Sequence, residues 1–147
     1  MGREVIIIKN KIMKGNDNKF YNVMTAKAAT GIGNVLYVGD ATSVHFFIAT
    51  DGGGDAALTV QFQVASTEKA PNFAAAQSKT NQWEYTNVTD AEDGASIDGD
   101  TGIAAASADM YRKVYLNIEP GTTWVAANVT ARTAGEVTVD ATITTSN

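Results

Sequence analysis

The C-terminal part of the chain alternates apolar and polar residues at a period of two, most clearly in the segments Thr122–Arg132 and Glu136–Thr144. In the second segment one face is apolar, while the opposite face carries threonines and acids. This alternation is typical of an antiparallel strand with one buried face and one face in water. We therefore predict a half-buried strand whose inward residues are Val137, Val139, Ala141 and Ile143.

The same period recurs earlier in the chain. Ser43–Ala49 places Val44, Phe46 and Ile48 on one face, and a second run alternates apolar residues with threonine and glutamine. The glycine-rich stretch Asp51–Asp55 separates the two runs, so we predict that they form a β-hairpin. The apolar residues of the second run are Leu58, Val60, Phe62 and Val64, and further strands are predicted over Val35–Val38, Trp83–Val88 and Lys113–Ile118.

The segment Ala65–Thr80 interrupts this pattern. Pro71 cannot donate a hydrogen bond to a strand ladder, and the segment is longer than the usual hairpin loop. We expect it to cross from one sheet to another. About seven to nine short strands with regular turn signals and no helical periodicity predict an all-β fold. The predicted architecture is an antiparallel β-sandwich, jelly-roll-like or immunoglobulin-like.

Residues 1–30 differ from the rest and are predicted to be an extended N-terminal arm, with residues 31–147 as the sandwich domain. The arm holds the apolar run Val5–Ile8, a turn signal at Gly15–Asn18 and a short strand-like run at Phe20–Met24. Because an unpaired apolar strand promotes aggregation, we expect the arm to pair with the body or with a neighbouring subunit.

Composition narrows the classes of function. The chain has 16 acidic and 11 basic side chains, for a formal net charge of -5, so nucleic acid is not an expected partner. The chain has no cysteine, which excludes disulfides, zinc–thiolate sites and a cysteine nucleophile. No apolar run reaches the roughly 18 residues of a membrane-spanning helix, so no membrane partner is expected.

The acidic segment Asp90–Asp100 is the main candidate for chemistry. Asp98 and Asp100 lie two residues apart among glycines, which suits a calcium loop. The segment lacks the complete EF-hand pattern, however, and aspartate with glycine is also common in plain turns. Both alternatives stay open. The same acids could also form the carboxylate pair of a glycosidase.

His45, the single histidine, is predicted to lie on the strand face opposite the apolar one. Neither a serine nor a threonine partner is marked by any motif, so we interpret His45 as a surface or interface residue. Trp83 and Trp124 are interpreted as packing residues, because aromatic side chains in alternating strands usually point inward. The sequence thus shows no catalytic signature, and we expect a protein without enzymatic activity.

Six short segments between Ala28 and the C-terminus are distinctive: Gly31–Val35, Ala70–Phe73, Asn81–Tyr85, Ile97–Ile103, Trp124–Ala126 and Thr133–Val139. In their content and order they resemble segments of small β-rich virion proteins of tailed bacteriophages. This resemblance implies a capsid decoration (head auxiliary) protein located in the virion after synthesis in the host cytoplasm. It also implies a homo-oligomer, commonly a trimer, bound to the major capsid protein, without catalytic residues or a cofactor.

Two other functions remain open from the sequence. A carbohydrate- or receptor-binding β-sandwich would use Trp83 or Trp124 as an exposed platform. A small hydrolase would use the acids of Asp90–Asp100, but no second element of an active site is recognisable.

Overall fold

The computed structural model describes residues 16–106 and 109–146, and in these residues it contains strands but no helix. None of the described residues belongs to a helix able to cross a membrane. The strands are β1 (Asn16–Lys27), β2 (Gly31–Ile32), β3 (Leu36–Tyr37), β4 (Ala41–Asp51), β5 (Ala57–Ala65), β6 (Glu84–Tyr85), β7 (Val88–Asp90), β8 (Ser96–Ile97), β9 (Ile103–Ala106), β10 (Tyr111–Asn117), β11 (Trp124–Ala134) and β12 (Glu136–Ser146).

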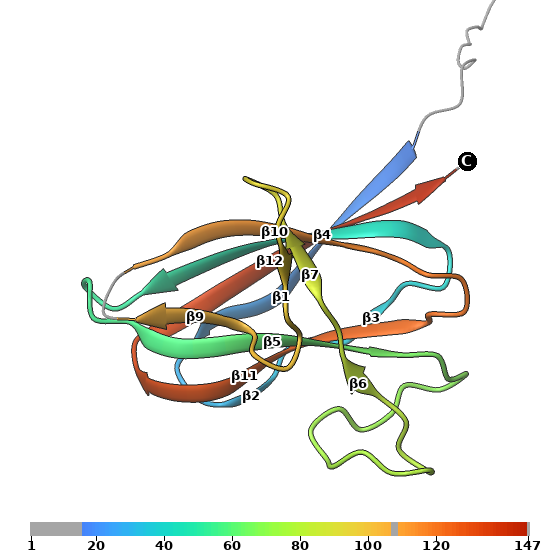
Figure 1. Cartoon of the computed structure of the whole chain (residues 1–147), viewed down its shortest axis with the longest axis horizontal. Coiled ribbons are helices and arrows are strands. Elements are labelled where there is room, and N and C mark those ends of the chain that lie inside the picture. Colours follow the sequence, from blue (N-terminus) through green and yellow to red (C-terminus); the bar gives the residue numbers. More distant parts are fainter. Residues whose placement is uncertain (1–15, 107–108, 147) are drawn as a thin grey trace, which may run out of the picture.

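These strands form two antiparallel sheets that pack face to face (Figure 1). Sheet 1 has the order β1-β12-β4-β10-β7-β8. Sheet 2 has the order β2-β11-β5-β6, with β3 also paired to β11 and β9 also paired to β5. The predicted all-β sandwich is therefore confirmed.

The core lies between the sheets and is built from the predicted inward residues. Val44, Phe46 and Ile48 of β4 are fully buried, and the apolar residues of β12 at alternate positions are also buried. Phe46 meets Phe62 of the opposite sheet with ring centroids 4.4 Å apart. Each strand thus buries one row of side chains, and the removal of this apolar surface from water is the main term that stabilises the sandwich.

The predicted hairpin at Asp51–Asp55 is wrong. β4 belongs to sheet 1 and β5 belongs to sheet 2, so this stretch carries the chain across the sandwich. Gly53 and Gly54 adopt positive φ angles of 64° and 90°, which allow the sharp change of direction. The side chain of Asp109 supports the turn, because its Oδ1 accepts hydrogen bonds from the backbone N–H groups of Gly52 and Gly54 at 3.1 and 3.2 Å.

The predicted sheet crossing at Ala65–Thr80 is also wrong. The chain leaves β5 and returns to the same sheet as β6, which pairs with β5. The intervening loop covers the outer face of sheet 2 and buries Phe73 against Ala65 and Ala126. The crossing instead follows β6, because β7 belongs to sheet 1.

Residues 16–27 lie within the range assigned to the N-terminal arm, yet they form a long edge strand of sheet 1. β1 pairs with β12 from Asn16, opposite Ser146, to Lys27, opposite Val137. Val23 and Met24 of this strand are buried in the core. The first residues of β1 and the last residues of β12 project together from the body (Figure 1). Residues 1–15, including Val5–Ile8, lie outside the described residues, so their role stays a prediction.

Candidate functional site

The outer face of sheet 1 exposes a group of aromatic side chains, which we call the aromatic face. It comprises Phe20 of β1, His45 and Phe47 of β4, and Tyr111 and Tyr115 of β10. In β4 and β10 the buried residues Val44, Phe46, Ile48 and Val114 alternate with His45, Phe47 and Tyr115, so alternation directs these aromatic residues outward. Strand pairing places Phe20 of β1 in the outward row of His45. Phe20 is 77% exposed, Tyr111 70% and Phe47 47%. Large exposed apolar groups that lie together mark interaction surfaces on soluble proteins.

Strand register brings these residues into rows across the sheet. Phe20 lies opposite Thr142, which lies opposite His45, which in turn lies opposite Tyr115. In the next row Asp140, Phe47 and Lys113 lie side by side. The rows surround a shallow hollow of about 320 Å³, lined by Phe20, Tyr21, His45, Phe46, Phe47, Lys113, Asp140, Ala141 and Thr142.

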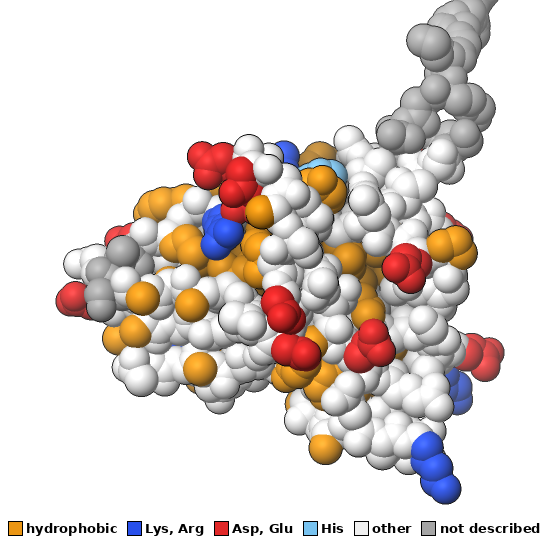
Figure 2. Space-filling model, viewed as in Figure 1, with side chains coloured by type: hydrophobic (Ala, Val, Ile, Leu, Met, Phe, Trp, Pro, Cys, Tyr) orange, Lys and Arg blue, Asp and Glu red, His pale blue; other side chains and the backbone are white. Residues whose placement is uncertain are grey.

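His45 is held against the sheet by stacking on Tyr115, with ring centroids 5.4 Å apart. Burial of the imidazole and the nearby charge of Lys113 lower the pKa of His45 below its ordinary value. Both effects favour the neutral imidazole over the charged one. Figure 2 shows the histidine, in pale blue, beside hydrophobic side chains at the upper rim of the molecule. The interpretation of His45 as a residue on the outward face fits this position.

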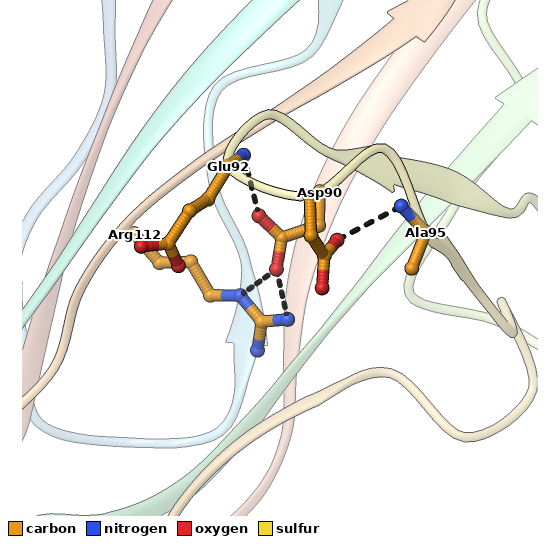
Figure 3. Close-up of polar contacts among 5 residues, drawn as sticks. Asp90, Glu92, Ala95 and Arg112 are labelled. Atoms are coloured by element: carbon orange, nitrogen blue, oxygen red, sulfur yellow. Dashed lines mark hydrogen bonds and ion pairs between the residues drawn. The ribbon is translucent and has the colours of Figure 1, made fainter.

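The acids of Asp90–Asp100 serve mainly as turn and ion-pair groups (Figure 3). Asp90 is buried, and its Oδ2 accepts hydrogen bonds from Arg112 Nη2 at 2.6 Å and Nε at 3.1 Å. Its Oδ1 accepts the backbone N–H of Glu92 at 2.9 Å. This backbone hydrogen bond, followed by the Arg112 guanidinium, lowers the pKa of Asp90. Asp93 Oδ1 accepts the backbone N–H of Ala95 at 2.9 Å.

Asp98 and Asp100 are both exposed. The Oδ1 of Asp98 accepts the backbone N–H of Asp100 at 2.9 Å, and its carbonyl accepts the N–H of Gly102, which is the geometry of a turn. In residues 16–106 and 109–146 no three acidic or histidine side chains gather in a way that could hold a metal ion. The geometry thus supplies a structural use for Asp98, and the calcium site stays a prediction.

Trp83 and Trp124 are half-buried beneath and beside the loop that covers sheet 2. Trp83 Nε1 donates to the carbonyl of Ala75 at 2.9 Å, and Trp124 Nε1 donates to the carbonyl of Thr67 at 3.0 Å. Both indoles therefore fasten this loop to the sheet, in agreement with their interpretation as packing residues. Trp83 also lines a polar cleft of about 460 Å³ together with Gln77, Gln82, Glu84 and Glu119.

The aromatic face itself was not predicted as a site. Partial signals were available, because His45 and Phe47 occupy outward positions of the predicted strand Ser43–Ala49, and Tyr115 occupies an outward position of Lys113–Ile118. Scattered outward aromatic residues are ordinary, and the pairing of β1, β12, β4 and β10 is what shows that they share one surface.

No protein-family model matches the chain, and no curated protein sequence matches it. Among solved structures, the fold is similar to that of the SPBc2 prophage-derived protein YomS, known from a crystal structure. The two folds align with a TM-score of 0.62 over 88% of this chain and 95% of the YomS chain, at 14% sequence identity. At this identity the likeness shows that the two chains share a β-sandwich fold.

Proposed function

We propose that the chain is a non-enzymatic structural protein of a bacteriophage particle, and most specifically a capsid decoration protein that binds the outer head surface. The observation that carries this proposal is the shared fold with a prophage-derived protein, which extends over 95% of that protein's chain. The resemblance of short segments such as Gly31–Val35 and Ile97–Ile103 to segments of phage virion proteins also supports a structural protein of the virion.

The surface chemistry supports a binding role. The aromatic face offers broad apolar contact on a rigid sheet, and aromatic residues are enriched at protein interfaces. Most acids of Asp90–Asp100 already form ion-pair or turn hydrogen bonds, which favours a role without turnover. A protein that binds only the assembled shell stabilises that shell by mass action, and several bound copies add avidity. The proposed partners are further copies of the chain, as a trimer, and the major capsid protein.

The test is to purify particles of the phage or prophage that encodes the chain and to quantify this chain against the major capsid protein by mass spectrometry. We expect a fixed, high ratio of the chain to the capsid protein, lost on mild stripping and restored by adding the purified protein. A ratio of only a few copies per particle would overturn the head assignment in favour of a tail component. Absence of the chain from purified particles would overturn the proposal.

A carbohydrate-binding module is the second candidate, supported by the polar cleft beside Trp83. Amide and carboxylate side chains next to an indole suit sugar hydroxyls and the apolar face of a pyranose ring. Titration with host cell-wall oligosaccharides, followed by tryptophan fluorescence, tests this candidate. Binding that Trp83→Ala removes and Trp124→Phe retains would support it, whereas an unchanged spectrum at saturating sugar would remove it.

A further inference from the structure

The aromatic face carries a symmetric arrangement of charge about one phenylalanine. Strand register places Asp140 of β12 directly beside Phe47 of β4, and Lys113 of β10 directly beside Phe47 on the other flank. All three residues are exposed. Since neighbouring strands lie about 4.8 Å apart, the acid and the base lie at similar distances on opposite sides of Phe47.

We propose that this face binds the same face of a second copy of the chain, about a two-fold axis that runs along β4 at Phe47. Because this axis is parallel to β4 and lies in the plane of the interface, each residue keeps its position along the strand direction. The order of the strands across the sheet is reversed, so that β12 of one copy lies over β10 of the other. Asp140 of one copy therefore lies opposite Lys113 of the other, and the reverse pair forms on the other flank. Phe47 meets Phe47 between these two ion pairs.

The neighbouring rows fit the same operation. In the row of His45, Thr142 of one copy lies opposite Tyr115 of the other. In the row of Ala49, Thr138 lies opposite Tyr111, which is 70% exposed in the single chain. Hydroxyl groups thus face phenols, and the aromatic rings leave water. Two twisted sheets pack in this aligned way at a separation of about 10 Å.

The net charge of -5 makes two copies repel each other over most of their surfaces, so self-association requires a contact with complementary charges. The charge pattern of the aromatic face meets this requirement and favours a second copy over an unrelated partner. The centre of the aromatic face carries one acid and one base, which makes it locally neutral. A two-fold contact requires each residue pair to occur twice, and the placement of Asp140 and Lys113 about Phe47 meets that requirement. The inference does not depend on the proposed function.

The test is the solution mass of the full-length protein and of charge-reversal variants, measured by light scattering and analytical ultracentrifugation. Asp140→Lys and Lys113→Glu each set like charges opposite one another, and each is expected to weaken self-association by about tenfold or more. The double variant exchanges both charges and is expected to restore it, because Lys at 140 then faces Glu at 113. Lys79→Glu, on the exposed loop outside sheet 2, serves as the control and leaves the mass unchanged.

The wild type is expected to contain an even number of subunits: a dimer, or two trimers joined across this face. A strict monomer or a lone trimer would overturn the two-fold contact without affecting the particle test. Single variants that associate like the wild type would overturn it too, as would a double variant that stays dissociated. Circular dichroism spectra and melting curves of every variant establish that each mass refers to a folded sandwich.

Discussion

At the scale of single residues, two glutamines of β5 show how loops change the environment of a strand. Gln61 and Gln63 alternate with the core residues of β5 and so belong to its outward face. They are nevertheless only 8% and 0% exposed, because loops cover that face. Gln61 Nε2 donates to the carbonyl of Gly99 at 2.9 Å, and Gln63 Nε2 donates to the carbonyl of Phe73 at 3.0 Å. Each amide therefore fastens one loop to sheet 2.

Replacing Gln63 by alanine is expected to destabilise the protein. The change leaves the carbonyl of Phe73 buried without its donor and opens a small cavity, for a loss of about 1–3 kcal/mol. Urea unfolding measures this loss. Gln82→Ala removes an amide that also donates to a loop carbonyl, that of Lys79, but at an exposed position. That control should change stability by no more than about 0.5 kcal/mol. Equal effects of the two variants would contradict the anchoring role of Gln63.

Asp90 makes stability depend on pH in the acid range. Its folded pKa lies below the unfolded value of about 4, so the unfolded chain binds more protons in this range. The contribution of Asp90 is fully present above the unfolded pKa and is lost as the pH falls through the folded pKa. Unfolding midpoints between pH 6 and pH 2 should therefore fall less steeply in Asp90→Asn than in the wild type. Asp55→Asn, at an exposed turn, is the matched control variant.

At the scale of elements, the sequence predicts which face of a strand is buried better than it predicts which strands pair with each other. The periodicity of Ser43–Ala49 and Glu136–Thr144 identified the buried rows because a side chain's face depends only on local alternation. The hairpin at Asp51–Asp55 was wrong because glycines permit both a tight turn and a crossing between sheets. Two half-buried strands show the same alternation whether they share a sheet or face each other across the core. The choice between these arrangements depends on the whole sandwich.

Gly135 lies in the connection from β11 to β12, where the chain crosses from sheet 2 to sheet 1, and it packs closely against Ala56. It has a φ of 84°, and a Cβ added there would lie 2.8 Å from the Cα of Ala56. Gly121 has a φ of 96° with nothing within 4 Å of an added Cβ. Gly121→Ala should cost about 1 kcal/mol from backbone strain alone. Gly135→Ala should cost about 1–3 kcal/mol more, because the backbone of Ala56 must also move. Equal melting temperatures for the two variants would contradict this argument, because they would show that the backbone of Ala56 moves at no measurable cost in stability.

At the scale of the whole molecule, the candidate surface is a product of sheet order. Phe20 and Phe47 are 27 positions apart in the sequence, and they reach one face because β12 lies between β1 and β4. Alternation alone could assign Phe47 to an outward row, but it could not bring β1 to the same sheet. The acidic segment Asp90–Asp100 suggested a calcium site or a catalytic carboxylate pair, because its residue types suit both kinds of chemistry. In the folded chain Asp90, Asp93 and Asp98 instead stabilise turns and an ion pair.

Because β1 begins at Asn16, a deletion can remove the N-terminal segment, residues 1–15, and leave this strand intact. Residues 1–15 carry Arg3, Lys9, Lys11 and Lys14, whereas the whole chain is acidic. Deletion of residues 1–15 keeps β1, so the melting temperature should change by only a few degrees. Binding to purified particles should weaken if the segment grips an acidic surface of the shell. Deletion of residues 1–27 should instead destabilise the sandwich, because it also removes the buried side chains of Val23 and Met24.

Charge and apolar contact within this segment can be separated by a variant that replaces its four basic residues with glutamine. If electrostatic attraction is the main contribution, this variant should bind particles as weakly as the deletion, and wild-type binding should weaken as salt is raised. If the apolar run Val5–Ile8 supplies the contact, the glutamine variant should retain binding, while replacement of Ile6 and Ile7 by serine should remove it. Unchanged binding after deletion of residues 1–15 would instead assign attachment to the sandwich itself.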